Sequence, residues 1–118
     1  MATIYDDIGG AAGVATAVDD FYARLLRDPA IGQYFDGVSM PRQIQHFRAF
    51  LTAALGGPQR YLGRDVRDAH AGLGITGTAF DAAVGHLVAT LRSLGVEAAT
   101  ITEIGTRLAP LRTQVVSA

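Results

Sequence analysis

The sequence predicts an all-α fold, and three observations support this prediction. In each long segment, apolar residues recur at steps of three and four, which is the period of an amphipathic helix. Glycine and proline separate these segments. No segment shows the strict alternation of apolar and polar residues that is typical of a half-buried strand. Because four of the expected helices are long and have wide apolar faces, we expect antiparallel pairs packed across one another.

The first half of the chain contains two of the long helices. One follows Gly9 and Gly10 and ends at Asp28-Pro29, and its apolar face consists of Val14, Val18, Phe21, Tyr22, Leu25 and Leu26. A short element over residues 30–35 follows. The second long helix covers residues 40–55. Ser39 is its expected N-cap, and Pro41 lies in the first turn, where proline is tolerated.

The second half begins with a break and then contains the other two long helices. Residues 56–64 are rich in glycine and are expected to form a loop, followed by a brief helical turn that carries His70. Thr78, with Asp81 three residues later, predicts the capped start of a helix that Gly95 closes. The last helix covers residues 101–115, and Pro110 is expected to bend its axis.

Composition narrows the function classes. The chain of 118 residues is expected to form one domain over residues 1–118, and its net charge of -1 with 18% charged residues argues against a nucleic-acid partner. No run approaches the roughly 18 apolar residues of a membrane span. We therefore expect a cytoplasmic protein. The absence of cysteine excludes disulfides, thiolate metal sites, cysteine nucleophiles and thioether-linked cofactors.

Motifs of common enzyme classes are missing. The histidines at positions 46, 70 and 86 lack the H-E-x-x-H spacing of zinc hydrolases. The Gly9-Gly10 pair follows no strand, and the chain contains no lysine that could complete a phosphate-binding loop. No G-x-S-x-G nucleophile elbow is present. The sequence therefore gives little support to a hydrolase or a nucleotide-binding enzyme.

Three residues remain ambiguous from the pattern alone. Gln43 interrupts an apolar face, because a turn of about 100° per residue places it close to Phe47 and Phe50. Tyr22 interrupts the face of the first helix in the same way. Both residues are either half-buried side chains with solvated polar tips or part of a site between helices. His70, between two alanines, is either a structural histidine or a metal ligand.

Read in order, short motifs along nearly the whole chain resemble the group I truncated haemoglobins. The motifs are Ile4-Tyr5-Asp6 before Gly9-Gly10, Asp20-Phe21-Tyr22, Tyr34-Phe35, Met40, Ala54-Leu55-Gly56-Gly57, His70 before Gly74-Ile75, Leu87, and Ile101-Thr102-Glu103-Ile104. This resemblance implies a shortened globin fold in which two helices cross two others around a non-covalent haem b. Its glycine pairs would form the tight turns that replace helices of the full-length globin.

The resemblance also assigns roles to individual residues. It places His70 as the proximal iron ligand and Tyr22 as the distal hydroxyl that donates to the bound gas, with Gln43 beside it. The other residues expected to contact haem are Phe35, Met40, His46, Phe47, Ile75, Phe80 and Val84, of which Phe80 and Val84 would line the proximal wall. Tyr61, Arg64 and Arg67 have suitable chemistry to bind the haem propionates.

The sequence departs from the family pattern at three positions. Phe47 stands where many members have a second polar residue facing the ligand, so one hydrogen-bond partner is lost. Leu51 replaces a phenylalanine that is proposed to gate a ligand tunnel in some members. His46 matches a position where some cyanobacterial members supply a second iron ligand, and the alternative is a histidine that faces solvent or a propionate. His86 is expected to be structural.

The resemblance implies a haem protein that binds dioxygen, carbon monoxide and nitric oxide. In its dioxygen-bound form it would oxidise nitric oxide to nitrate, with an unidentified reductase as partner. A six-coordinate electron-transfer or peroxidase-like protein is the alternative if His46 binds iron. From the amphipathic pattern alone, a haem-free helical interaction module is also compatible with the chain.

Overall fold

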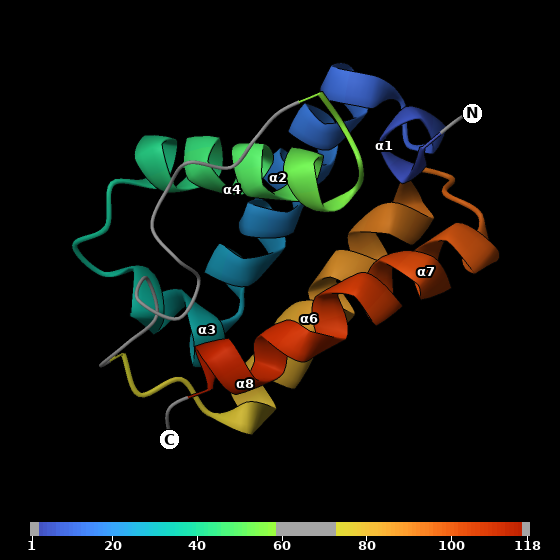
Figure 1. The fold of residues 1–118 in the computed structure, drawn as a ribbon. Helices are drawn as coiled ribbons and strands as arrows, with labels where there is room; N and C mark the ends of the chain where they lie inside the picture. The colour runs from blue at the N-terminus through green and yellow to red at the C-terminus, as the bar shows by residue number, and fades with distance from the viewer. Residues whose placement is uncertain (1–2, 59–72, 117–118) are drawn as a thin grey trace.

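The computed structural model describes residues 3–58 and 73–116, and within these ranges every regular element is a helix (Figure 1). The elements are α1 (Ile4–Asp7), α2 (Gly10–Arg27), α3 (Pro29–Gly32), the 3-10 helix η1 (Gln33–Phe35), α4 (Met40–Ala54), α6 (Gly77–Ser93), α7 (Ala98–Leu108), the 3-10 helix η2 (Ala109–Leu111) and α8 (Arg112–Val115). The all-α prediction is confirmed.

The long helices form two pairs that cross each other. In Figure 1, α2 lies against α4, whereas α6 and α7 run side by side beneath them. Helix α2 also packs against α6 and so joins the two pairs. This is the arrangement of two helices over two that the resemblance implied.

Helix boundaries agree with the sequence prediction except at two caps and in the last predicted helix, which begins at Ala98 and is divided into α7, η2 and α8. Helix α6 is capped by Thr76, whose side chain accepts a hydrogen bond from the Ala79 amide, so the prediction that Thr78 caps it was wrong by two residues. Ser39 occupies the N-cap position of α4, as expected, but its side chain makes no capping bond. Pro110 lies in η2, which separates α7 from α8 where the bend was expected.

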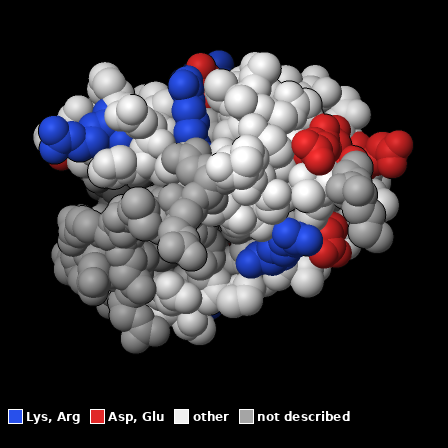
Figure 2. Space-filling view, turned by 45° about the horizontal axis from the view of Figure 1, so that its top comes forward, with Lys and Arg blue, Asp and Glu red and all other residues white. Residues whose placement is uncertain are grey.

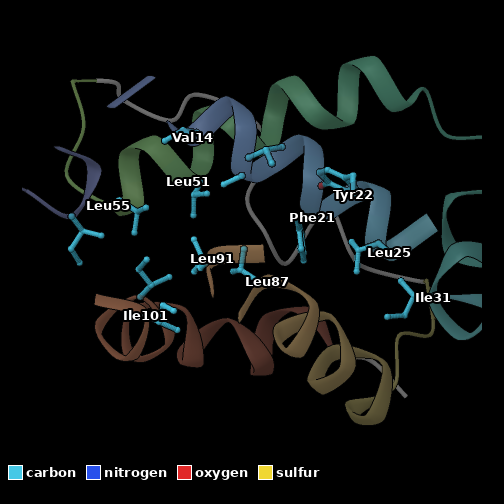
Figure 3. Close-up of a cluster of buried hydrophobic side chains, with 14 residues drawn as sticks. Val14, Phe21, Tyr22, Leu25, Ile31, Leu51, Leu55, Leu87, Leu91 and Ile101 are labelled. Carbon is cyan, nitrogen blue, oxygen red and sulfur yellow. The ribbon is translucent and has the colours of Figure 1, made fainter. Parts of the chain in front are cut away.

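The hydrophobic core lies where the two pairs cross (Figure 3). In Figure 3, Leu51 and Leu55 of α4 face Leu91 and Ile101 of the lower pair. The buried core residues on α2 are Val14, Ala17, Val18, Phe21, Tyr22 and Leu25. Leu26 was expected on this face and instead is 46% exposed, in the last turn of α2, whereas the neighbouring Leu25 is buried.

Polar contacts tie α2 to the opposite helix pair. The Thr90 hydroxyl of α6 donates to Asp20 Oδ2 at 2.7 Å, and the same oxygen accepts from Arg24 Nε at 2.7 Å. At the C-terminal end of α2, His86 Nε2 lies 2.9 Å from Asp28 Oδ2. Hydrogen bonds from His86 and from the Ala30 amide hold the pKa of Asp28 below its ordinary value. His86 therefore has a structural contact, as expected.

The surface shows mixed charge. On the face in Figure 2, arginine and acidic side chains of the described residues are scattered and form no continuous basic patch. Across residues 3–58 and 73–116, none of the helices has the length and apolar character needed to cross a membrane.

The start of α2 requires a glycine at position 13. A β-carbon at Gly13 would collide with the backbone carbonyl oxygen of Ile8. We expect Gly13→Ala to lower the free energy of unfolding by about 1 to 3 kcal/mol, measured by urea denaturation. Gly85→Ala is the matched control, because a β-carbon at Gly85 meets nothing within 4 Å, and it should raise stability by about 0.5 to 1 kcal/mol. Equal effects of the two substitutions would contradict this packing argument.

Candidate functional site

Tyr22 is the polar residue that α2 carries into the core. Its side chain is only 4% exposed. In Figure 3, Phe21 points from α2 toward the lower helix pair, and the Tyr22 ring lies beside it, with the two ring centroids 5.4 Å apart. Consecutive helical residues differ by about 100° in direction, so α2 can give one aromatic residue to the core and the next to the contact with α4.

Gln43 is the hydrogen-bond partner of Tyr22. Its Nε2 donates to the Tyr22 hydroxyl oxygen at 3.1 Å, across the interface between α4 and α2. A hydroxyl oxygen that accepts from an amide still has its own proton to donate. The sequence placed each residue on the apolar face of its own helix, and the structure brings the two side chains together.

Aromatic rings pack against the ring of Tyr22. Phe35 and Phe47 each meet the Tyr22 ring edge to face, at centroid distances of 5.7 Å and 5.8 Å. Phe21 lies 5.4 Å from Phe47, and Phe50 stacks on Phe47 at 6.2 Å. Phe21 and Phe50 were not among the predicted site residues. The signal for Phe50 was its position on the same face of α4 as Gln43 and Phe47.

This apolar environment changes the chemistry of the phenol. Burial raises the pKa of Tyr22 from its ordinary value of 10.0 to about 12, and the hydrogen bond from Gln43 offsets part of that rise. Tyr22 is therefore protonated at neutral pH and is a hydrogen-bond donor throughout the physiological range.

The raised pKa predicts a loss of stability at alkaline pH. The folded state holds the Tyr22 proton more tightly than the unfolded state does, so this stability is complete below pH 10.0 and is lost as pH rises toward about 12. The expected loss is about 2 to 3 kcal/mol. Urea denaturation from pH 9 to pH 12 should show it in the parent and not in Tyr22→Phe. Parallel pH profiles of the two proteins would contradict the prediction.

Several residues expected to contact haem keep apolar surface that is partly accessible. Of the residues expected to contact haem, Phe35, Met40, Phe47, Ile75 and Phe80 are half-buried, and Val84 is 38% exposed. Aromatic and aliphatic side chains that stay partly accessible next to a buried tyrosine fit a flat apolar group. The residues present therefore fit haem.

Phe80 and Val84 lie apart from the cluster around Tyr22. They line a cavity of about 300 Å³ between α6 and α7, together with Leu87, Val88, Leu108 and other mainly apolar residues. Met40 lines a separate surface groove with Pro41, Ile44 and Arg48. The structure thus groups the distal residues on α2, η1 and α4, whereas the residues expected on the proximal wall lie along α6.

The histidines differ in what the structure shows. His46 is exposed on α4, and His86 is paired with Asp28. His70 and the expected propionate partners Tyr61, Arg64 and Arg67 lie outside the described residues. Within the described ranges, no group of three or more His, Cys, Asp or Glu side chains could hold a metal ion.

Comparison with known proteins identifies the family. Residues 3–117 match the family described as bacterial-like globin. A group 1 truncated haemoglobin from a Synechocystis species is 44% identical over 108 residues, covering 88% of this chain and 87% of that protein. The chain is a group 1 truncated haemoglobin. A relative from Mycolicibacterium paratuberculosis is 39% identical, over 97% of this chain and 84% of its own.

Solved structures of similar proteins show the same fold. The truncated haemoglobin of Tetrahymena pyriformis in its Fe(III) form superposes with a TM-score of 0.94 at 34% identity, covering 99% of this chain and 100% of that one. The 2/2 haemoglobin of a Synechococcus species, in the cyanomet state and with covalently attached haem, gives 0.92 at 37% identity and 98% coverage of both chains. The two-over-two prediction is confirmed, and membership in this family implies a haem globin that binds diatomic gases such as oxygen.

Proposed function

We propose that this truncated haemoglobin binds dioxygen in a distal pocket where Tyr22 is the hydrogen-bond donor, with His70 as the proximal ligand of iron. One observation carries the distal half of the proposal. The Tyr22 hydroxyl is buried and accepts a hydrogen bond from Gln43, so its proton is available to a gas molecule in the pocket.

The haem and the protein side chains have different roles in binding the gas. Haem, when bound, supplies the ferrous iron that binds the gas and shares an electron with it. Tyr22 donates its proton toward the negative charge that the gas acquires, in an apolar pocket where such a bond is strong. Gln43 holds the phenol in place, and Phe35 and Phe47 exclude water from it. His70 would fix the iron from the opposite side.

Nitric oxide oxidation is the reaction that we propose for the dioxygen-bound protein. One nitric oxide, one dioxygen and one electron give one nitrate. The protein must then receive an electron to begin again, so a reductase is the expected partner. Carbon monoxide would bind at the same site without reaction. We propose a cytoplasmic location for this activity.

The cofactor that we propose is haem b held without a covalent bond. The chain has no cysteine for thioether links. Tyr61, Arg64 and Arg67 are the proposed donors to the propionates, and Phe80, Val84 and Ile75 are the proposed contacts on the proximal side. Acidified organic solvent should therefore extract the haem completely, whereas haem that stays with the protein would contradict this assignment.

The test of the proposed function uses the purified ferrous protein. Its absorbance spectrum with and without carbon monoxide reports haem content and gas binding together. Addition of nitric oxide to the dioxygen-bound protein should then give one nitrate for each haem and leave ferric protein. A protein that holds no haem, or that releases no nitrate, would contradict the corresponding part of the proposal.

The iron is six-coordinate without added gas if His46 binds it and five-coordinate if His46 does not. Because its side chain is exposed, and the Phe47 ring next to it packs against Tyr22, we expect a high-spin ferrous spectrum without added gas. Carbon monoxide should bind in one fast phase whose rate His46→Leu changes by less than about twofold. A low-spin parent that becomes high-spin in His46→Leu would instead support the six-coordinate electron-transfer or peroxidase-like alternative.

A further inference from the structure

Beyond the distal pair itself, one contact on the far side of α2 bears on the direction of the Tyr22 hydroxyl. The Thr90 side chain is fully buried, at 0% exposure, yet its hydroxyl donates to Asp20 Oδ2 at 2.7 Å. Leu87 and Leu91 lie on either side of it along the same face of α6 and are buried as well. A polar bond in an otherwise apolar contact is directional, whereas the surrounding apolar contacts are not.

Asp20 and Tyr22 lie on opposite sides of one helix. Helical residues two positions apart point in directions that differ by about 200°. If residue 20 of α2 faces α6, residue 22 therefore faces away from α6, toward α4. The two observed partners agree, because Thr90 belongs to α6 and Gln43 to α4. Rotation of α2 about its axis would therefore move both contacts together.

The Asp20 carboxylate is held in its charged form. Hydrogen bonds from Arg24 and from Thr90 are the two largest causes that hold the pKa of Asp20 below its ordinary value. Hydrogen bonds to a charged acceptor are stronger than those between neutral groups. A second contact, at 2.9 Å, joins His86 of α6 to Asp28, the C-cap residue of α2, eight residues after Asp20. Tyr22 lies between the two contacts in the sequence of α2.

Small rotations of α2 would matter to the site. A rotation of about 10° moves an atom about 8 Å from a helix axis by more than about 1 Å. The Tyr22 oxygen must keep its 3.1 Å distance from Gln43 and direct its own proton into the pocket. A misplacement of about 1 Å is enough to weaken a positioned interaction severalfold.

We propose that Asp20 and Thr90 are positioning residues for Tyr22, since their hydrogen bond fixes the rotation of α2 against α6 and thereby the direction in which the Tyr22 hydroxyl donates to the gas. This inference rests on the proposed role of Tyr22 as the distal donor. Neither Asp20 nor Thr90 contacts the gas in this arrangement.

Two substitutions at position 90 separate positioning from stability. Thr90→Val keeps the side-chain volume and removes the hydroxyl, whereas Thr90→Ser keeps the hydroxyl and leaves a small void. We expect Thr90→Val to shift the infrared stretching band of bound carbon monoxide toward its position in Tyr22→Phe and to raise the dioxygen dissociation rate about threefold. Thr90→Ser should retain the parent band and a rate within about twofold, although urea denaturation finds it less stable.

The double variant Tyr22→Phe/Thr90→Val distinguishes positioning of the Tyr22 hydroxyl from a purely structural role of Thr90. With Tyr22→Phe already present there is no hydroxyl to direct, so Thr90→Val should change the dissociation rate by less than about 1.3-fold. Thr102→Val is the control, because the Thr102 hydroxyl is exposed and donates to the Ala98 carbonyl of its own helix α7. It should leave the band and the rate unchanged.

The outcomes separate this inference from the proposed function. If Tyr22→Phe moves the band and Thr90→Val does not, Tyr22 is the donor and the positioning role is wrong. If Tyr22→Phe moves neither band nor rate, both proposals fail. Equal effects of Thr90→Val in the parent and in Tyr22→Phe would also overturn the positioning role. If Thr90→Val does not hold haem, Asp20→Asn weakens the same bond with the side-chain shape kept and should give a smaller shift in the same direction.

Discussion

Replacing His70 with alanine is expected to lower the haem content of the purified protein by about tenfold or more, because the substitution removes the proposed proximal bond to iron. The other two histidines are poorly placed to substitute for it. His86 is engaged with Asp28 at 2.9 Å, and His46 is exposed on α4. The ratio of haem absorbance to protein absorbance measures the effect directly.

His86→Ala is the matched control for this experiment. It removes an imidazole of the same size and breaks the 2.9 Å contact with Asp28, but it leaves His70 in place. We expect some loss of stability and a full complement of haem. Added imidazole should restore haem binding to His70→Ala by occupying the space of the lost side chain. Full haem content in His70→Ala, with an unchanged ferrous spectrum, would end the assignment of His70 as the ligand.

The sequence predicted the helices well because their signals are local. Periodicity of three and four residues located all four long helices, and glycine or proline marked their ends. The prediction failed at the start of α6, where Thr76 and Thr78 are both possible caps. Only the path of the preceding chain decides which hydroxyl reaches a free amide, and periodicity carries no information on that path.

The candidate site was predictable in part. Tyr22 and Gln43 each interrupt an apolar helical face, and this local anomaly marked both residues before their 3.1 Å contact was visible. The contact of Asp20 with Thr90 was not predictable, since the two residues lie 70 positions apart and depend on how α2 crosses α6. Local patterns do not indicate which polar residues on apolar faces would meet at one ligand. For Tyr22 and Gln43, that expectation came from the resemblance to the family.

Tyr22→Phe is expected to raise the dioxygen dissociation rate by roughly tenfold or more, since a hydrogen bond to a charged partner contributes about 1.5 to 3 kcal/mol. The substitution removes one oxygen atom and keeps the ring, so the edge contacts with Phe35 and Phe47 should survive. Rapid mixing of the dioxygen-bound protein with excess carbon monoxide measures the rate.

Two comparisons make this result specific to the Tyr22 hydroxyl. Tyr5→Phe deletes the same atom from a tyrosine that packs against Gly57 at the other end of the fold, and the rate should not change. Gln43→Leu leaves the phenol intact but removes the amide that holds it, so the rate should rise by less, about threefold. Phe47 offers no hydrogen bond, so among the predicted distal residues only Gln43 and His46 carry a group that could replace the donor at position 22. A dissociation rate in Tyr22→Phe equal to that of the parent would mean that the hydroxyl points away from the gas.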